Sequence, residues 1–150
     1  MGAAFDWKTV LLARHAQHVV LIHFPIALFL AGVAFDFAAR WTKRASLATV
    51  AFYNIVIAAV FAVPVIITGL LAWRWQLEGQ RLHGLLLLHL IFGCTSGALI
   101  LVSAWLQIRG RKTANDRGFK YRFPIEVLGA LLVAITAHLG GFLSGVNVAG

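Results

Sequence analysis

Apolar residues fill four long stretches of the chain, and polar residues gather in the short segments between them. The stretches span about residues 17–39, 46–75, 82–107 and 124–145. Each is at least as long as the ~20 residues with which an α-helix crosses the hydrocarbon core of a bilayer. We therefore expect an all-α integral membrane protein in which residues 1–150 form a single transmembrane domain, a four-helix up-down-up-down bundle. The sequence shows no convincing internal repeat.

The composition supports a membrane protein and excludes several other classes. Hydrophobic residues make up 61% of the chain and charged residues 12%, and the mean hydropathy is +0.86. A soluble domain is about a quarter charged. The net charge of +8 does not indicate nucleic-acid binding, because the basic residues lie between the apolar stretches. The single cysteine, Cys94, excludes a disulfide framework and a Cys/His zinc ribbon.

The distribution of basic residues predicts the orientation in the membrane. The connections near residues 40–44 and 109–122 share one side and hold nine basic residues, whereas the other side has only Lys8, Arg14, Arg74 and Arg81. Loops rich in Lys and Arg stay in the cytoplasm. We therefore expect a protein of the bacterial inner membrane with both termini and the turn at residues 76–80 on the periplasmic side.

All six histidines fall on that outer side in the predicted topology. His15, His18 and His23 begin the first helix, His83 and His89 begin the third, and His138 lies near the end of the fourth. A rise of ~1.5 Å per residue places His23 about 7–8 Å deeper than His18, and His89 about 9 Å deeper than His83. The sequence therefore predicts a deeper layer of His23, His89 and His138 below a layer nearer the interface.

Small residues share a helix face with each histidine of the deeper layer. Residues three or four apart lie on the same face of a helix. By this spacing the small neighbours are Ala27, Ala31 and Ala34 for His23; Gly93, Ser96 and Gly97 for His89; and Ala130, Ala134, Gly141 and Gly145 for His138. Such faces are typical of close helix packing, with histidine bonding across helices. Such faces also leave room for a flat macrocycle held by axial imidazoles. We favour this interpretation because all three histidines of the deeper layer have small neighbours on the same face and lie at a similar depth.

The pattern therefore predicts a small b-type cytochrome with one or two bis-histidine haems near the periplasmic face. The axial candidates are His23, His138 and His89, followed by His83 and His18, and the candidates for pairing with haem propionates are Arg14, Arg74 and Arg81. A c-type haem is excluded because no Cys-x-x-Cys-His occurs. Without a nucleophile constellation or a phosphate loop, we expect an electron-transfer protein more than a stand-alone enzyme, working between the quinone pool and a periplasmic carrier such as cytochrome c.

Two alternatives stay open. Neutral imidazole also suits copper and zinc, and a metal site would draw on His15, His18, His23 and His83. The chain is also compatible with a non-catalytic membrane anchor of a respiratory complex, in which histidines bond across helices, or with a homodimer. Two acids lie near the cytoplasmic ends of their helices: Asp36 has Arg40 at i+4, which predicts a local ion pair, and we expect Glu126 to be an acid near its helix N-terminus.

Several motifs are similar to a known family. The segment His23-Phe24-Pro25-Ile26-Ala27-Leu28 resembles the His-Phe-Pro-x-Ala-Leu signature of the bacterial membrane family catalogued as domain of unknown function 2231. Weaker likenesses are Thr68-Gly69-Leu70, His83-Gly84-Leu85-Leu86 and His138-Leu139-Gly140-Gly141, so that the resemblance covers about residues 15–148. His15 and His89 have no counterpart in the pattern. The resemblance implies a four-helix membrane domain found beside c-type cytochrome or Rieske modules, and a site built on His23, His83 and His138.

Overall fold

Four long helices account for almost all of the structure. The computed structural model describes residues 14–75, 81–112 and 121–144, in which α2 spans Arg14–Thr42, α3 Ala45–Trp75, α4 Gly84–Lys112 and α5 Arg122–Leu143. All four are long and apolar enough to cross a membrane. The predicted fold class and the four helices are confirmed. Residues 1–13, which the sequence predicts to be either a short segment on the membrane surface or a frayed terminus, lie outside the described part.

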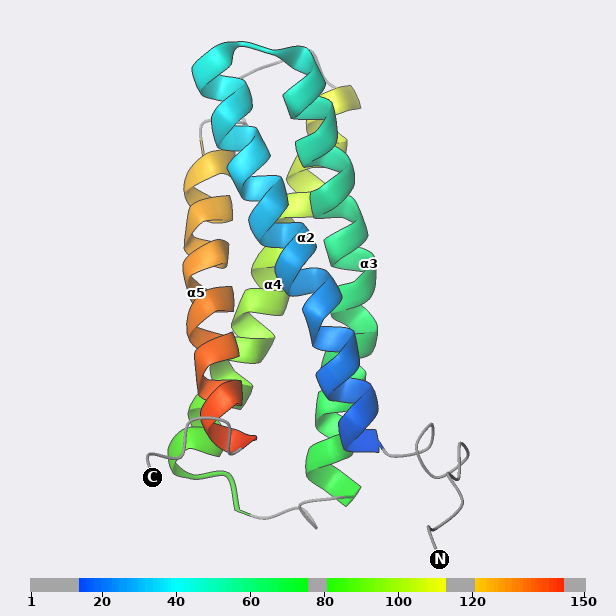
Figure 1. Cartoon of the computed structure of the whole chain (residues 1–150), viewed down its shortest axis with the longest axis vertical. Coiled ribbons are helices and arrows are strands. Elements are labelled where there is room, and N and C mark those ends of the chain that lie inside the picture. Colours follow the sequence, from blue (N-terminus) through cyan, green and yellow to red (C-terminus); the bar gives the residue numbers. More distant parts are fainter. Residues whose placement is uncertain (1–13, 76–80, 113–120, 145–150) are drawn as a thin grey trace, which may run out of the picture.

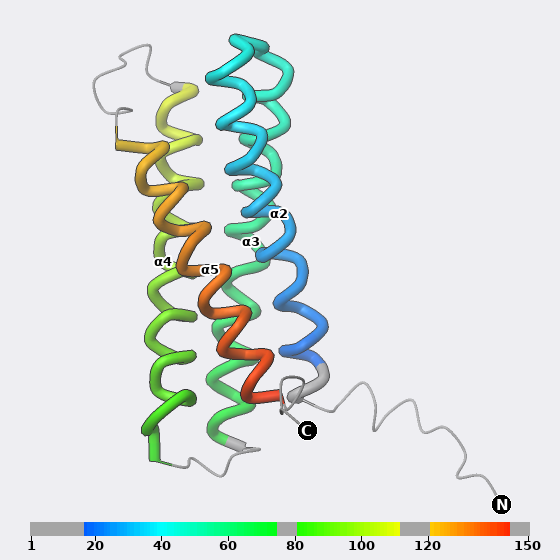
Figure 2. Tube along the Cα trace, turned by 60° about the vertical axis from the view of Figure 1, so that its left-hand side comes forward, coloured from blue at the N-terminus to red at the C-terminus, as the bar shows by residue number. Residues whose placement is uncertain are grey.

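The helices alternate in direction and form an up-down-up-down bundle (Figure 1). The start of α2, the end of α3, the start of α4 and the end of α5 therefore share one end, which we call the histidine end (Figure 2). The opposite end, with the α2–α3 connection, is called the basic end. Helix α2 packs against α3 and α5, and α4 packs against the same two helices.

Buried residues recur in the two hairpins, α2–α3 and α4–α5, at a constant offset of 71. Nine described residues of α4 and α5 are buried, and eight of them lie 71 residues after a buried residue of α2 or α3. These pairs are Pro25/Ser96, Phe29/Ile100, Gly32/Ser103, Val33/Ala104, Asp36/Gln107, Ile55/Glu126, Ala58/Gly129 and Ala62/Val133. The two hairpins therefore share a pattern of buried positions that residue types along the sequence do not show.

Glycines let the helices approach closely at three of the interfaces. A Cβ added to Gly32 would lie 2.6 Å from Ile55 Cγ1 in the α2–α3 interface, and one added to Gly97 would lie 2.7 Å from Ile66 Cδ1 between α3 and α4. At Gly129 of α5, the added atom would meet the Phe29 ring of α2 at 3.0 Å. Without a hydrophobic drive between helices in lipid, this close packing is what holds a membrane bundle together.

Candidate functional site

The topology brings the described histidines to one end of the bundle. His18 and His23 lie in the first turns of α2, His83 directly precedes α4, His89 lies in the second turn of α4, and His138 lies near the end of α5. His83 is exposed. His15 belongs to α2, but its side chain lies outside the described part. These histidines divide into two kinds: rings held between two helices of one hairpin, and rings on the outer surface of the bundle.

His18 is held between α2 and α3. Its Nδ1 lies 3.2 Å from Thr68 Oγ1, and its Cε1 would lie 2.9 Å from a Cβ at Gly69. The Thr68 hydroxyl has one proton, which it donates to the carbonyl oxygen of Pro64 at 2.9 Å or of Val65 at 3.1 Å. The hydroxyl oxygen can then only accept from the imidazole. His18 therefore donates from Nδ1.

His89 has the equivalent arrangement between α4 and α5. Its Nδ1 lies 3.1 Å from the Thr136 carbonyl oxygen, and its Cε1 would lie 3.1 Å from a Cβ at Gly140. A carbonyl oxygen only accepts, so that His89 also donates from Nδ1. His89 and Gly140 each lie 71 residues after their counterparts in the first hairpin, His18 and Gly69. The repeat seen in the core therefore extends to the histidine end.

These two hydrogen bonds fix the same tautomer in both rings. In the neutral imidazole the proton is on Nδ1, and the lone pair that can bind a metal is on Nε2. Histidines that ligate metals almost always donate their other ring N–H to a carbonyl, carboxylate or water, which orients the ring and raises its basicity. His18 and His89 are therefore oriented as metal-ligating histidines are.

His23 and His138 lie on the outer surface. Both side chains are exposed, and neither has a hydrogen bond or ion pair within residues 14–75, 81–112 and 121–144; the His138 ring contacts Phe142 edge-on at 4.8 Å between ring centroids. The residues 71 positions away, Cys94 and Ile67, are also exposed. Of the predicted deep layer, the structure thus turns His89 inward and the other two outward.

The remaining predicted site residues do not gather around one point in the described part of the chain. Arg74 and Arg81 are exposed, and the side chain of Arg14 is outside the described residues. Within the described ranges, no three or more His, Cys, Asp or Glu side chains are grouped as a metal site requires. The propionate pairing and the four-histidine metal site therefore stay predictions.

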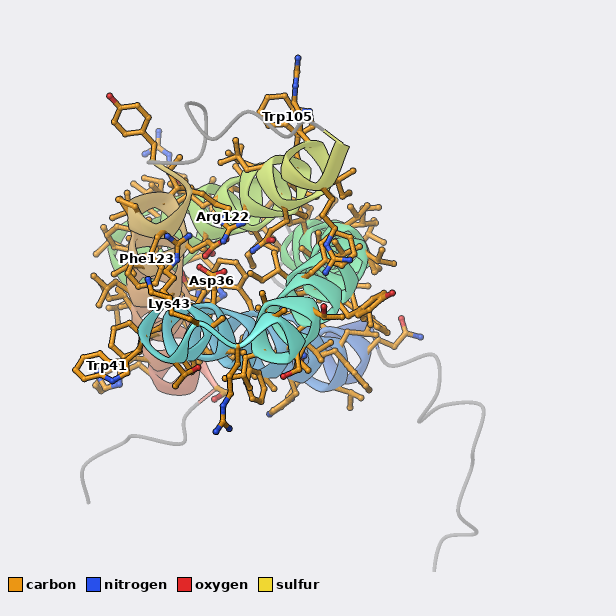
Figure 3. The ribbon with its side chains drawn as sticks, turned by 90° about the horizontal axis from the view of Figure 1, so that it is seen from above. Asp36, Trp41, Lys43, Trp105, Arg122 and Phe123 are labelled. Carbon is orange, nitrogen blue, oxygen red and sulfur yellow. The ribbon has the colours of Figure 1, made fainter. Side chains whose placement is uncertain are left out.

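A second polar site, at the basic end, was only partly visible in the sequence. Asp36 is 2% exposed and accepts from two arginines, Arg40 Nε and Arg122 Nη2, each at 2.6 Å. Figure 3 shows Asp36 and Arg122 turned toward one another inside the bundle. The predicted Asp36–Arg40 ion pair is confirmed, whereas the link to Arg122, 86 residues away, was missed.

The same network continues onto α4 and α5. Arg122 Nη1 donates to Gln107 Oε1 at 3.3 Å, and Gln107 Nε2 donates to Glu126 Oε1 at 2.9 Å. Arg122 Nε lies 3.5 Å from the same Glu126 oxygen, and Glu126 is fully buried. Three helices thus meet around two carboxylates and two guanidinium groups. We call Asp36, Arg40, Gln107, Arg122 and Glu126 the polar cluster.

Aromatic residues surround this end of the bundle. The Arg40 guanidinium lies 4.9 Å from the centroid of the Phe123 ring, which itself lies 6.1 Å from the Phe37 ring. Trp41 and Trp105 point outward at the same end (Figure 3). Indole rings favour the membrane–water interface. Trp41 and Trp105 therefore indicate a membrane–water interface at this end of the bundle, beside the polar cluster.

Comparison with known proteins gives one match. The family model described as predicted membrane protein (DUF2231) matches residues 14–149, which include all four helices. No curated protein and no solved structure matches the chain significantly. The matched span covers most of the chain and agrees with the resemblance noted from the His23–Leu28 motif. The chain belongs to this family of predicted membrane proteins, DUF2231.

Proposed function

We propose that this protein is a small b-type cytochrome, with a haem held at the histidine end by His18 and His89. The observation that carries the proposal is the matched pair of Nδ1 hydrogen bonds, to Thr68 Oγ1 and to the Thr136 carbonyl oxygen. Both bonds leave Nε2 as the unprotonated nitrogen of a neutral ring. The two histidines lie 71 residues apart, and therefore at equivalent depths of the two hairpins.

The residues present fit this cofactor by their chemistry. Bis-histidine ligation of haem needs two neutral imidazoles in apolar surroundings, and both rings lie among apolar helices that are long enough to span a membrane. Haem supplies a one-electron carrier when it is bound. The chain's own contribution is to orient the two imidazoles and, through the Nδ1 donors, to set their basicity and with it the reduction potential.

An optical spectrum of the purified, reduced protein, expressed with ample haem, tests the proposal. We expect a Soret band and an α band, and loss of most bound haem in His18→Ala and His89→Ala. The matched controls His23→Ala and His138→Ala, on the outer surface, should keep the spectrum. If the controls lose haem while His18→Ala and His89→Ala keep it, the ligands are the outer pair; if the wild type binds none, the proposal fails.

The hydrogen bonds of His18 and His89 also favour a second candidate, a membrane anchor subunit in which both rings only join helices. Each bond crosses from one helix of a hairpin to the other. In that case His18→Phe and His89→Phe lower the unfolding temperature while no cofactor is lost, because none is bound. A cytochrome c or Rieske-type partner that co-purifies with the protein would support a role in a respiratory complex in either case.

The site of His15, His18, His23 and His83 for copper or zinc remains the third candidate. Metal analysis of the purified protein decides it: one copper or zinc per chain without haem replaces the cytochrome proposal.

A further inference from the structure

Three buried side-chain atoms in or beside the polar cluster have no hydrogen-bond partner in the described part of the chain: Ser103 Oγ of α4, and Arg122 Nε and Glu126 Oε2 of α5. Arg122 Nε still lies 3.5 Å from Glu126 Oε1, whereas Ser103 and Glu126 are both 0% exposed. Leaving a polar atom unpaired in a dry interior is costly, so such atoms are normally paired with water or another polar group. The histidine site does not use either residue.

Ser103 and Glu126 occupy positions equivalent to a contacting pair of the first hairpin. They lie 71 residues after Gly32 and Ile55, and a Cβ at Gly32 would lie 2.6 Å from Ile55 Cγ1. The second hairpin therefore has a hydroxyl and a carboxyl where the first has a hydrogen atom and an alkyl side chain.

The charges around the pair differ between the two acids of the cluster. Asp36 has one arginine on each oxygen, at 2.6 Å. Glu126 shares Arg122 with Asp36, has Gln107 as a further partner on Oε1, and lies beside the Asp36 carboxyl group. On α4 the residues Ser103 and Gln107 are uncharged, and α3 has no charged residue before Arg74, at the opposite end. Among the described residues, each Asp36 oxygen therefore has its own arginine, whereas Glu126 Oε2 has none.

We propose that Glu126 is a proton-binding carboxyl that exchanges a proton with the solvent at the basic end. Protonation gives Glu126 an O–H donor beside the Asp36 carboxyl group, and ionisation releases that proton to the solvent. The charge of Asp36, Arg40, Arg122 and Glu126 together changes between +1 and 0. The proposal is independent of haem.

Dicyclohexylcarbodiimide, which modifies protonated carboxyls in apolar surroundings, tests it on the full-length protein in liposomes. Peptide mapping by mass spectrometry should find the adduct on Glu126 and none on Asp36. Because only the protonated acid reacts, labelling should fall about tenfold or more from roughly pH 5 to pH 9. Glu126→Gln should abolish the adduct and, as an isosteric amide, keep the Gln107 contact and the fold.

Infrared difference spectra between the same pH values give a second readout that needs no reagent access. A protonated-carboxyl C=O band should be present in the wild type at low pH and disappear in Glu126→Gln. An adduct on Asp36 instead of Glu126 would overturn the assignment. So would the absence of both the adduct and the band at every pH.

Discussion

At the scale of single residues, Arg122 has the most partners in the polar cluster. It contacts Asp36, Gln107 and Glu126 from a side chain that is 19% exposed, whereas Arg40 contacts Asp36 and is 41% exposed. Removing one partner of a buried ion pair leaves an uncompensated charge and costs about 3–5 kcal/mol, but an exposed pair is worth about 0–1 kcal/mol. We therefore expect Arg122→Ala to lower the free energy of unfolding by about 3–5 kcal/mol, and Arg40→Ala by much less, in detergent unfolding curves.

Arg122→Gln with Glu126→Gln is the control for that prediction. The double variant removes one positive and one negative charge, so it should unfold at a higher denaturant concentration than Arg122→Gln alone. If Arg40→Ala lowers the free energy of unfolding as much as Arg122→Ala, the cluster is organised around Asp36 alone. The hydrogen bonds onto α4 and α5 then contribute nothing to stability.

A second prediction for single residues concerns the helix contacts at glycine. Gly32→Ala places a methyl group 2.6 Å from Ile55 Cγ1, whereas Gly93→Ala meets Thr136 Cγ2 at an ordinary 3.6 Å. Overpacking a tight interface costs about 1–3 kcal/mol. We expect that loss for Gly32→Ala, almost none for Gly93→Ala, and partial recovery in Gly32→Ala/Ile55→Ala. Equal unfolding curves for both alanine variants would show that α2 and α3 can move apart freely.

At the scale of elements, the connection between α2 and α3 depends on one residue. Lys43 has φ +58°, the left-handed conformation that usually follows a helix C-terminus and that glycine adopts without strain. Side chains in this region cost about 1–2 kcal/mol. Lys43→Gly should therefore be more stable than the matched control Lys43→Ala by roughly 1 kcal/mol, measured as a higher unfolding midpoint. The reverse order would mean that the Lys43 side chain, and not its backbone, shapes the turn.

The elements themselves were the most predictable part of the chain. The four predicted ranges agree with the helices to within a few residues at each end, because membrane spans are defined by length and apolar content alone. Which face of each helix turns inward was not predictable. Lipid-facing and buried positions are both apolar, so small residues beside His23 did not reveal that its ring is exposed while that of His18 is not. Contacts such as Asp36–Arg122 depend on that same choice of face.

At the scale of the whole molecule, the two hairpins share most of the buried positions of α4 and α5 and differ in chemistry. One pair of equivalent buried positions holds Asp36 and Gln107, and another holds Ile55 and Glu126. A comparison of residue types along the sequence therefore does not detect the repeat. Equivalent positions of the two hairpins share a helix face and a depth but not a residue type. The bundle can therefore hold matched histidines at the histidine end and a single polar cluster at the basic end. The register of the buried positions is the same in the two halves because close packing requires it, whereas residue size and charge differ.

The orientation of the whole bundle is a testable consequence of its charge. The described part of the basic end includes Arg40, Lys43, Arg44, Arg109 and Arg111, and loops rich in Lys and Arg remain cytoplasmic. In a Cys94→Ser background, Ala45→Cys at the start of α3 and Leu82→Cys before α4 place one thiol at each end without removing a basic residue. A membrane-impermeant maleimide added to intact spheroplasts should label Leu82→Cys and leave Ala45→Cys unlabelled until the membrane is permeabilised. The opposite pattern would put the histidine end in the cytoplasm, and a periplasmic electron acceptor could then not reach a haem bound by His18 and His89.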